Sequence, residues 1–273
     1  MVITGPEVLA QNDINQSFAI IMYHHISEDK SMVGDYVITP ETFENDLKYL
    51  KQKGYKSITV RNLYAINNNE RTLAPKSIMI TFDDGQESFY KYAYPLLKKY
   101  GFSAVFSVIG KYTEMYSNIN DHNIKYSHVT WAQMNEMAKS TVVEFGNHSY
   151  DMHTNTGVGR SGVTQKAGES DEQYRLALET DIKTYNNFFE KNLGYTPSIF
   201  TYPCITAIGV LSSCDASDTN LLCSSKASSN SSIIELNTIF TLSTSSFNPE
   251  ILTLLLSPFF FTSSIVDIRF LSL

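Results

Sequence analysis

The sequence predicts an α/β fold built on a mainly parallel sheet, either open or closed into a barrel. Short apolar runs, typical of strands buried on both faces, alternate with segments whose apolar residues recur at helical spacing. Four of the six predicted strands end in His, Asp or Tyr-Pro residues. Because parallel sheets bind ligands at the carboxyl ends of their strands, we expect a functional site at that edge.

The first half of the chain contains four predicted strands and two predicted helices. Each helix has a local start or stop signal: Thr39 and Pro40 fit a cap and a first turn, and Gly54 and Gly101 follow the last helical residues. The predicted elements are a strand at 18–23, a helix at 40–53, a strand at 55–60, a strand at 78–82, a helix at 89–100 and a strand at 103–108.

The second half continues the same alternation. Thr130 is predicted to cap a short helix, and Ser170 with Gln173 has the spacing of a capping box. The predicted elements are a polar loop at 110–129, a helix from Thr130 to Lys139, a strand at 141–145, a loop at 154–168, a helix from 170 to about 192 and a strand at 198–202.

Composition excludes several classes of protein. The formal charge of -7 and the lack of a Lys or Arg run argue against a nucleic-acid partner. No Gly-rich phosphate loop stands at a strand-to-helix turn, which argues against a nucleotide-binding protein. The three cysteines have no metal-site spacing and indicate no disulfide framework. The first twenty residues show no basic and apolar segments of a secretory signal.

Two adjacent carboxylates at the end of a buried strand, Asp83 and Asp84, indicate a site that holds a cation or a shared proton. A plain Asp-Gly turn is the alternative interpretation. Asp84, His148 and His153 together offer one oxygen and two nitrogen ligands and leave a position open for water. The five-residue step between the histidines does not fit one helix face, so a loop must bring them together. A structural role for each histidine is the alternative.

Three segments resemble the first three motifs of the polysaccharide deacetylase family, also called the NodB-homology domain or carbohydrate esterase family 4. They are Thr81-Phe82-Asp83-Asp84-Gly85, His148 to His153, and Phe200-Thr201-Tyr202-Pro203. Tyr23-His24-His25-Ile26 and the five-residue histidine step resemble the branch that deacetylates poly-β-1,6-N-acetylglucosamine. The resemblance covers residues 18–203 and leaves 1–17 as an N-terminal extension. It implies a distorted (β/α) barrel, which we expect to be incomplete at the C-terminus.

The resemblance implies metal-dependent hydrolysis of N-acetyl groups on a β-linked N-acetylglucosamine polymer, with release of acetate. Peptidoglycan and chitin-like chains carry the same reacting group as poly-N-acetylglucosamine. An impaired homologue that only binds carbohydrate is the alternative. The amino-sugar polymer is the implied partner, and the implied location is extracellular or at the cell surface.

The resemblance also assigns residue roles. Asp84, His148 and His153 would hold one divalent metal, with zinc expected. Asp83 would be the general base and His24 the general acid, with His25 as the alternative acid. The backbone N–H of Cys204 would bind the oxyanion, and Tyr202 and Pro203 would contact substrate. The family usually continues the third motif as Tyr-Pro-Tyr-Gly, whereas this chain has Cys204-Ile205 after Pro203.

Four aromatic residues could stack on sugar rings. They are Tyr112, Tyr116, Tyr126 and Trp131. Core packing or loop attachment is the alternative role, and the more common one for such residues.

The composition changes at residue 204. Residues 204–273 contain no Tyr and no His, sixteen serines, and only seven of the chain's 49 charged residues. They show no helical or strand period, and the apolar run at 251–261 is too short for a membrane span. We expect this tail to be foreign to the family, as a shifted reading frame or a chimeric join near residue 204 would produce.

Overall fold

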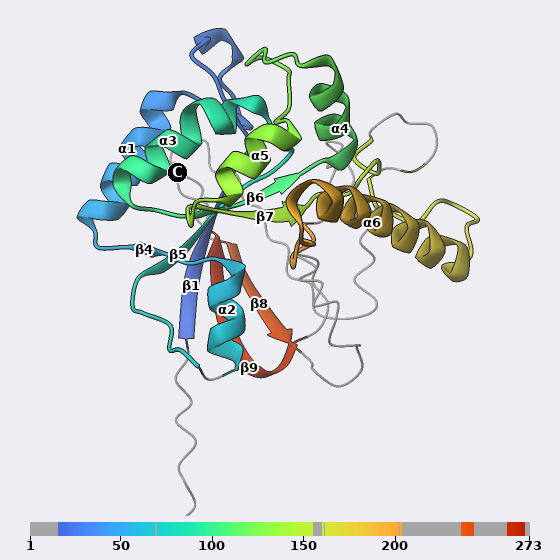
Figure 1. Ribbon diagram of the computed structural model, residues 1–273. Helices are drawn as coiled ribbons and strands as arrows, with labels where there is room; N and C mark the ends of the chain where they lie inside the picture. Colours follow the sequence, from blue (N-terminus) through green and yellow to red (C-terminus); the bar gives the residue numbers. More distant parts are fainter. Residues whose placement is uncertain are drawn as a thin grey trace, which may run out of the picture.

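The computed structural model describes residues 16–68, 70–154, 160, 162–201 and 203, and the backbone of strands at 236–242 and 261–270. Its parallel sheet with surrounding helices confirms the predicted fold class (Figure 1). The strands of the main sheet are β1 (Gln16–Tyr23), β4 (Lys56–Ser57), β5 (Ser77–Phe82), β6 (Ala104–Val108), β7 (Val143–Asn147), β8 (Leu236–Leu242) and β9 (Phe261–Phe270).

The sheet runs in the order β7-β6-β5-β1-β9-β8, and β4 pairs with the beginning of β5. All pairs are parallel except β8 with β9. A separate short pair joins β2 (His25–Ile26) to β3 (Val37–Ile38), with the single helical turn η1 (Lys30–Met32) between them. The parallel pairing brings the carboxyl ends of β1, β5, β6 and β7 to one edge.

Helices cover both faces of the sheet. They are α1 (Pro40–Gln52), α2 (Val60–Asn67), the π-helical segment η2 (Phe89–Ala93), α3 (Tyr94–Tyr100), α4 (Gly110–Ile119), α5 (Trp131–Ala138) and α6 (Asp171–Leu193). Helix α1 contacts α3, and α5 contacts both α4 and α6. Figure 1 shows α1, α3 and α5 on one side of the molecule and α2 beside β1.

Alternate residues of the central strands enter two apolar cores. Ile21 of β1 and Phe82 of β5 belong to the larger core beneath α1, α3, α5 and α6. Ile20 and Met79, the other face of the same strands, belong to a smaller core with residues of α2. Because both faces of these strands are buried, their sequences are continuously apolar instead of alternating between apolar and polar residues.

The predicted helix starts are present. The side chains of Thr39, Thr130 and Ser170 accept hydrogen bonds from N–H groups in the first turns of α1, α5 and α6. The helix predicted over 89–100 begins as the wide segment η2. Pro95 offers no N–H to the preceding turn, which accounts for the irregular hydrogen bonding there.

The predicted strand at 55–60 is wrong beyond Ser57. Strand β4 covers only Lys56–Ser57, although the N–H of Ile58 still donates to the carbonyl of Ile78 in β5 at 2.8 Å. Thr59 precedes α2, which the sequence analysis missed. The backbone N–H of Thr59 donates to the side chain of Asn62 at 2.9 Å, so a local capping contact starts a helix where β-branched residues suggested a strand.

Two further predictions need correction. The loop expected at 110–129 contains the ten-residue helix α4, whose buried Thr113 and Tyr116 lie on one face. The strand expected at 198–202 is reduced to one parallel bridge, between Phe200 and Asn147 of β7. The chain there still continues the sheet beside β7, because Thr201 N–H donates to the carbonyl of Asn147 at 2.8 Å.

Residues 204–273 contribute two strands, β8 and β9, to the sheet, although their sequence shows no apolar pattern typical of strands. Gln16 to Ile20 of β1 lie in parallel register with Val266 to Phe270 of β9. Strand β1 is therefore paired on both sides, with β5 and with β9.

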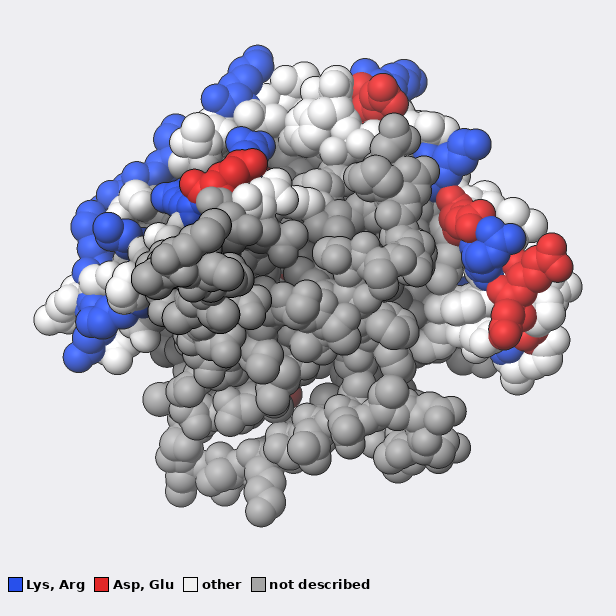
Figure 2. All heavy atoms as spheres, turned by 90° about the horizontal axis from the view of Figure 1, so that it is seen from below, with Lys and Arg blue, Asp and Glu red and all other residues white. Residues whose placement is uncertain are grey.

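Charge is unevenly distributed over the surface. Figure 2 shows Lys and Arg side chains along one edge, and both signs side by side at the opposite edge. Lys51 and Lys99, from α1 and α3, both lie over the ring of Tyr100, at 5.8 and 5.2 Å from its centroid.

In the part of the chain that is described, no helix has the length and apolar character needed to cross a membrane.

Candidate metal centre

The turn after β5 has a left-handed backbone at two consecutive residues. Asp84 has φ of 72° and Gly85 has φ of 83°. A Cβ on Gly85 would lie 2.6 Å from Cγ1 of Val108, at the end of the neighbouring strand β6. Glycine is therefore required here by both backbone conformation and space, and it lets the Asp83-Asp84 pair lie close to the sheet edge.

Asp84, His148 and His153 converge at this edge. Oδ1 of Asp84 lies 3.4 Å from Nε2 of His148 and 3.2 Å from Nε2 of His153. One ligand atom from each residue lies within 4.8 Å of the others. Ligands of a tetrahedral zinc ion at about 2.0 Å would lie about 3.3 Å apart, so the two distances from Asp84 to the histidines fit such an ion.

The ring of His148 is fixed by a carbonyl group. Its Nδ1 lies 3.0 Å from the carbonyl oxygen of Thr201 and must carry the proton in this contact, because a carbonyl can only accept. When this ring is neutral, its lone pair is therefore on Nε2, which faces Asp84; when the ring is protonated, Nε2 carries a proton and donates to Asp84 instead. A hydrogen bond to the second ring nitrogen is the usual arrangement of a metal-binding histidine.

The electrostatics of the cluster favour positive charge at its centre. Burial alone would raise the pKa of Asp84, but the hydrogen bonds from His148 and His153 outweigh it and hold that pKa below its usual range. Burial alone would lower the pKa of His148, but Asp84 and Asp83 raise it. The carboxylate is ionised, and a cation at its oxygen is stabilised.

Asp83 is more deeply buried than Asp84. Its side chain is 5 % exposed, and its backbone N–H donates to the carbonyl of Tyr23 at 3.0 Å. Burial raises the pKa of Asp83, and the neighbouring rings of His148 and then His24 oppose that shift. Within the described residues, Oδ1 of Asp83 has no hydrogen-bond partner. A buried carboxylate oxygen without a partner is available for a proton or a bound water.

The two histidines after β1 have different surroundings. His24 is partly exposed, and its ring meets that of Tyr36 edge-on at 5.0 Å. His25 is buried, with Nδ1 3.0 Å from Oγ of Ser88. Because that oxygen already accepts the N–H of Ile26, its hydroxyl proton can donate to His25. His25 is thus tied to the start of η2, whereas His24 is free of such a structural bond in the described part of the chain.

The third motif is described only in part. Thr201 and Pro203 are both buried, and Thr201 contacts His148 as above. Tyr202 and Cys204, predicted to contact substrate and to bind the oxyanion, lie outside the described residues.

His128 is a buried residue near the site that the sequence analysis did not single out. The rings of Tyr112 and Tyr116 lie 4.6 and 5.5 Å from its ring. Burial lowers the pKa of His128 to about 4, against an opposing effect of Asp84, so the ring is neutral at neutral pH. No local pattern in the sequence distinguishes this histidine.

Two of the four aromatic residues considered for sugar stacking are buried in the fold. Tyr116 stacks on His128 and is buried. Trp131 is also buried, and its Nε1 donates to Glu114 at 2.8 Å. Tyr126 is 53 % exposed and remains available for a ligand.

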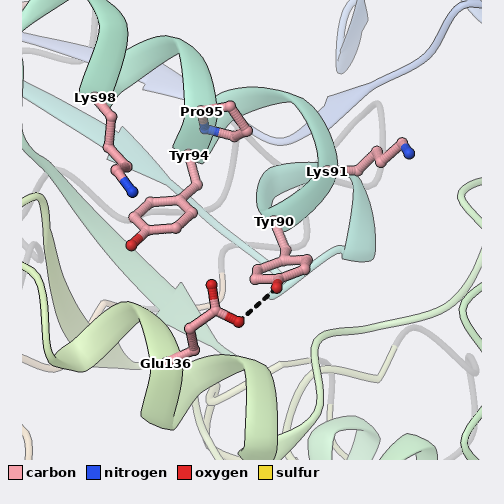
Figure 3. A pocket seen from close by; sticks show the side chains of 6 residues that line it. All are labelled: Tyr90, Lys91, Tyr94, Pro95, Lys98 and Glu136. Atoms are coloured by element: carbon pink, nitrogen blue, oxygen red, sulfur yellow. Dashed lines mark hydrogen bonds between the residues drawn. The ribbon is translucent and has the colours of Figure 1, made fainter.

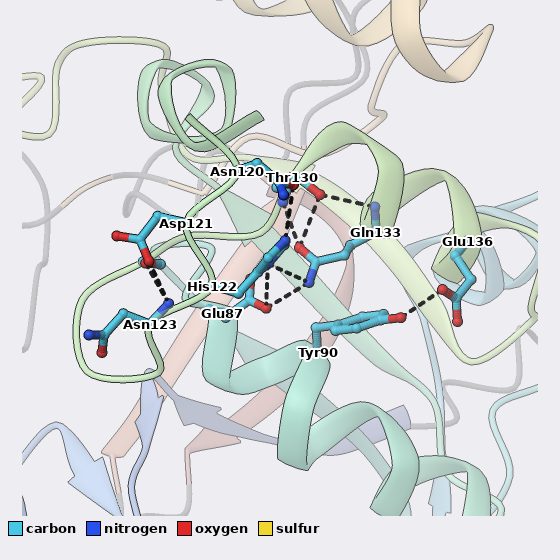
Figure 4. A network of polar contacts seen from close by, with 10 residues as sticks. Glu87, Tyr90, Asn120, Asp121, His122, Asn123, Thr130, Gln133 and Glu136 are labelled. Carbon is cyan, nitrogen blue, oxygen red and sulfur yellow. Dashed lines mark hydrogen bonds and ion pairs between the residues drawn. The ribbon is translucent and has the colours of Figure 1, made fainter. Parts of the chain in front are cut away.

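A buried polar network fixes the segment that follows α4 (Figure 4). Oε1 of Glu87, two residues after Gly85, accepts from Nε2 of Gln133 at 2.6 Å and lies 3.0 Å from Nδ1 of His122. Oε1 of Gln133 in turn accepts a hydrogen bond from the backbone N–H of Thr130 at 2.8 Å. The network attaches residues 120–133, which include His128, to the turn that carries Asp83 and Asp84.

Two depressions of the described surface differ in their relation to the cluster. One, of about 620 Å³, is lined by residues of α6 and by residues of the segment 150–154 other than His153. The other, of about 450 Å³, is lined by Tyr90, Tyr94 and Glu136 together with three other residues (Figure 3). In it, the hydroxyl of Tyr90 donates to Glu136 at 2.7 Å. The first depression is lined by the two chain neighbours of His153, Met152 and Thr154, whereas the second is lined by no neighbour of a cluster residue.

Comparisons with known proteins place the chain among described families and structures. Residues 70–207 match the family described as polysaccharide deacetylase. Poly-beta-1,6-N-acetyl-D-glucosamine N-deacetylase of Escherichia coli K12 is 22 % identical over 216 residues, covering 72 % of this chain and 32 % of that protein. The chain spans about a third to a little over half of the length of the curated relatives it matches.

Solved structures give the same fold. A de-N-acetylase from Aggregatibacter actinomycetemcomitans superimposes with a TM-score of 0.59 at 23 % identity, covering 68 % of this chain and 79 % of that one. The Streptococcus pyogenes deacetylase PplD in complex with acetate gives 0.54 at 28 % identity, covering 68 % and 73 %.

Proposed function

The chain belongs to the polysaccharide deacetylase family, and we propose that it hydrolyses the N-acetyl groups of a β-linked N-acetylglucosamine polymer and releases acetate. The observation that carries the proposal is the convergence of Asp84, His148 and His153 at the carboxyl edge of the sheet. The ring orientation that Thr201 imposes on His148 supports it, because it aims Nε2 at Asp84, where the ion would be held.

In this proposal Asp84, His148 and His153 hold one divalent metal, with zinc favoured by the nitrogen-rich ligand set. Such an ion would lower the pKa of a bound water and polarise the acetyl carbonyl. Asp83 accepts the proton of the attacking water, a role suited to its unpartnered, buried oxygen.

His24 gives a proton to the departing amine. It is preferred to His25 because His25 is buried and bonded to Ser88. The N–H of Cys204 is proposed to bind the oxyanion, and Tyr202 and Pro203 to contact substrate.

Poly-β-1,6-N-acetylglucosamine is the substrate we favour. The supporting observation is the names of the relatives, which are poly-beta-1,6-N-acetyl-D-glucosamine N-deacetylases. The location that follows from such a substrate is extracellular or at the cell surface. Acetate release from β-1,6-linked and β-1,4-linked oligomers, compared at equal concentration, tests the linkage.

The central experiment compares wild type with His148→Ala and Asp83→Asn. Metal content is measured by elemental analysis of the purified proteins, and acetate release is measured on the same samples. We expect wild type to carry about one metal per chain and to release acetate. His148→Ala should lose both. Asp83→Asn should keep the metal and lose activity about 10²- to 10⁴-fold, because only the proton acceptor is removed.

Other outcomes have distinct meanings. Metal without acetate release in wild type would favour the impaired, carbohydrate-binding homologue. Equal metal content in wild type and His148→Ala would show that the ion binds elsewhere, and the proposed centre would fail.

A further inference from the structure

The loop that carries the second histidine of the cluster is attached to α6 by a buried carboxylate. Asp181 lies in the middle of α6 and is 8 % exposed. Its Oδ1 accepts the backbone N–H of Tyr150 at 2.7 Å, and its Oδ2 accepts that of Asp151 at 2.8 Å. Each carboxylate oxygen therefore holds one N–H of the loop between His148 and His153.

The whole loop is held in this way by side-chain oxygens. The N–H of Ser149 donates to Oδ1 of Asn147 at 2.8 Å, and that of Met152 donates to Oγ of Ser149 at 3.2 Å. All four N–H groups between the two histidines thus have side-chain acceptors, and Asp181 supplies two of the four. Asp181 is also the acceptor most distant in sequence, about thirty residues away, whereas Asn147 is the last residue of β7 and Ser149 belongs to the loop itself.

The loop conformation needs this support because it is not a regular one. Ser149 has φ of 68°, a left-handed conformation that costs a serine about 1 kcal/mol or more. The carbonyls of Ser149 and Tyr150 accept from Gly110 and Lys111, at the start of α4. The loop is therefore held between two helices, α4 at its carbonyls and α6 at its N–H groups.

We propose that Asp181 is a positioning residue that sets the place of His153 relative to Asp84 and His148. His148 is fixed by β7 and by the Thr201 carbonyl, so it does not depend on α6. His153 follows the loop, and its distance of 3.2 Å from Asp84 depends on the loop conformation. The inference rests on the proposed metal centre.

The test measures metal affinity rather than turnover. Co²⁺ is titrated into metal-free protein against a competing chelator, and its visible absorption reports the ligand geometry. Asp181→Asn keeps the size of the side chain and one acceptor oxygen. Its NH₂ group takes the place of the other oxygen, so one of the two backbone N–H groups, of Tyr150 or Asp151, loses its acceptor. We expect affinity for Co²⁺ to fall about 10- to 100-fold, with an altered visible spectrum.

Glu179→Gln is the matched control. Glu179 lies on the same helix, is exposed, and pairs only with Arg175 among the contacts of the described residues. This variant should bind Co²⁺ like wild type. In a His153→Ala background, Asp181→Asn should change affinity less than twofold, because the residue through which it acts is already gone.

Several outcomes would overturn the inference. Equal Co²⁺ affinity and spectrum in wild type and Asp181→Asn would refute the role of Asp181 and leave the metal centre standing. An equal loss of affinity with and without His153 would show general damage to the fold. Absence of Co²⁺ binding in wild type would refute the metal centre and this inference together.

Asp181→Glu provides a second comparison if Asp181→Asn does not fold. It keeps the charge but moves the carboxylate by one methylene, so we expect a smaller loss of Co²⁺ affinity than for Asp181→Asn. Wild-type affinity in this variant would count against a positional role.

Discussion

Two neighbouring carboxylates, Asp83 and Asp84, have opposite chemistry because the turn after β5 places them in different surroundings. Burial raises the pKa of Asp83, whereas hydrogen bonds from two histidines lower that of Asp84 despite its burial. Adjacent acids whose pKa values are pushed apart can divide the tasks of proton acceptor and metal ligand. Of the two acids, only Asp84 has the left-handed backbone of this turn.

Replacement of Gly85 by Ala is expected to destabilise the fold strongly. The new Cβ would be 2.6 Å from Val108 Cγ1, in a backbone conformation that alanine disfavours. We expect the free energy of unfolding to fall by about 2 to 4 kcal/mol in urea titration. Gly54→Ala is the control, since Gly54 also has positive φ but no atom lies within 4 Å of the added Cβ. Gly54→Ala should lower the free energy of unfolding by only about 1 kcal/mol. Equal costs would show that the contact with Val108 does not matter.

At the scale of elements, α1 is joined to the end of β1 by a half-buried polar contact. The hydroxyl of Tyr23 donates to Oδ2 of Asp46 at 3.1 Å, and the ring of Tyr23 packs on Phe43 and Phe82. Burial raises the pKa of Asp46 to about 6, against a smaller lowering effect of the Tyr23 hydrogen bond. The residue that follows Tyr23 is His24, so this contact supports the strand end that carries the proposed acid.

The raised pKa of Asp46 predicts a pH-dependent stability. Between its ordinary value near 4 and about 6, the unfolded chain has lost the proton that the folded chain still holds, so stability falls as pH rises through this window. Asp46→Asn removes this titration, and we measure the free energy of unfolding of both proteins in urea. The value for Asp46→Asn minus the value for wild type should be about 1 to 2 kcal/mol larger at pH 8 than at pH 4, allowing for partial exposure of Asp46. A difference that is constant across this range would contradict the shift.

The sequence predicts elements well where local patterns and tertiary structure agree. Strands β1, β5, β6 and β7 were predicted because burial on both faces leaves a continuous apolar run. Helix α4 was missed because a polar, Tyr- and Asn-rich segment carries a weak helical pattern, and α2 because Ile58 and Val60 suggest a strand.

The residues of the site, like the elements, could be predicted only where a local sequence pattern marks them. Asp84, His148 and His153 stand in recognisable motifs at strand ends, and the structure brings them together. Asp181 and His128 have no such local signal. Their importance depends on contacts with segments far away in the sequence, which no short pattern records.

For the whole molecule, the arrangement of the sheet decides which segments can reach the site. The strand ends that carry the candidate residues belong to β1, β5 and β7, and β6 lies between β5 and β7. On the other side of β1 the sheet is completed by β9 and β8, from the segment whose composition differs from the rest.

We expect residues 204–273 to be foreign to the family. The family match ends at residue 207, and the change of composition begins at 204. Sequencing the source gene through codon 204 should find a frame shift or a join there. An unbroken reading frame that encodes this tail in the native organism would refute the prediction.

The contact between His148 and the Thr201 carbonyl joins residues 53 positions apart, and Asp84 lies further still from both. An unfolded chain holds these groups at random separations and binds an ion only weakly. Metal at a hundred times its dissociation constant would thus stabilise the folded chain by about 2.7 kcal/mol. Metal supply would then govern how long the protein survives proteases, and a chelating environment would shorten its lifetime even with no substrate present.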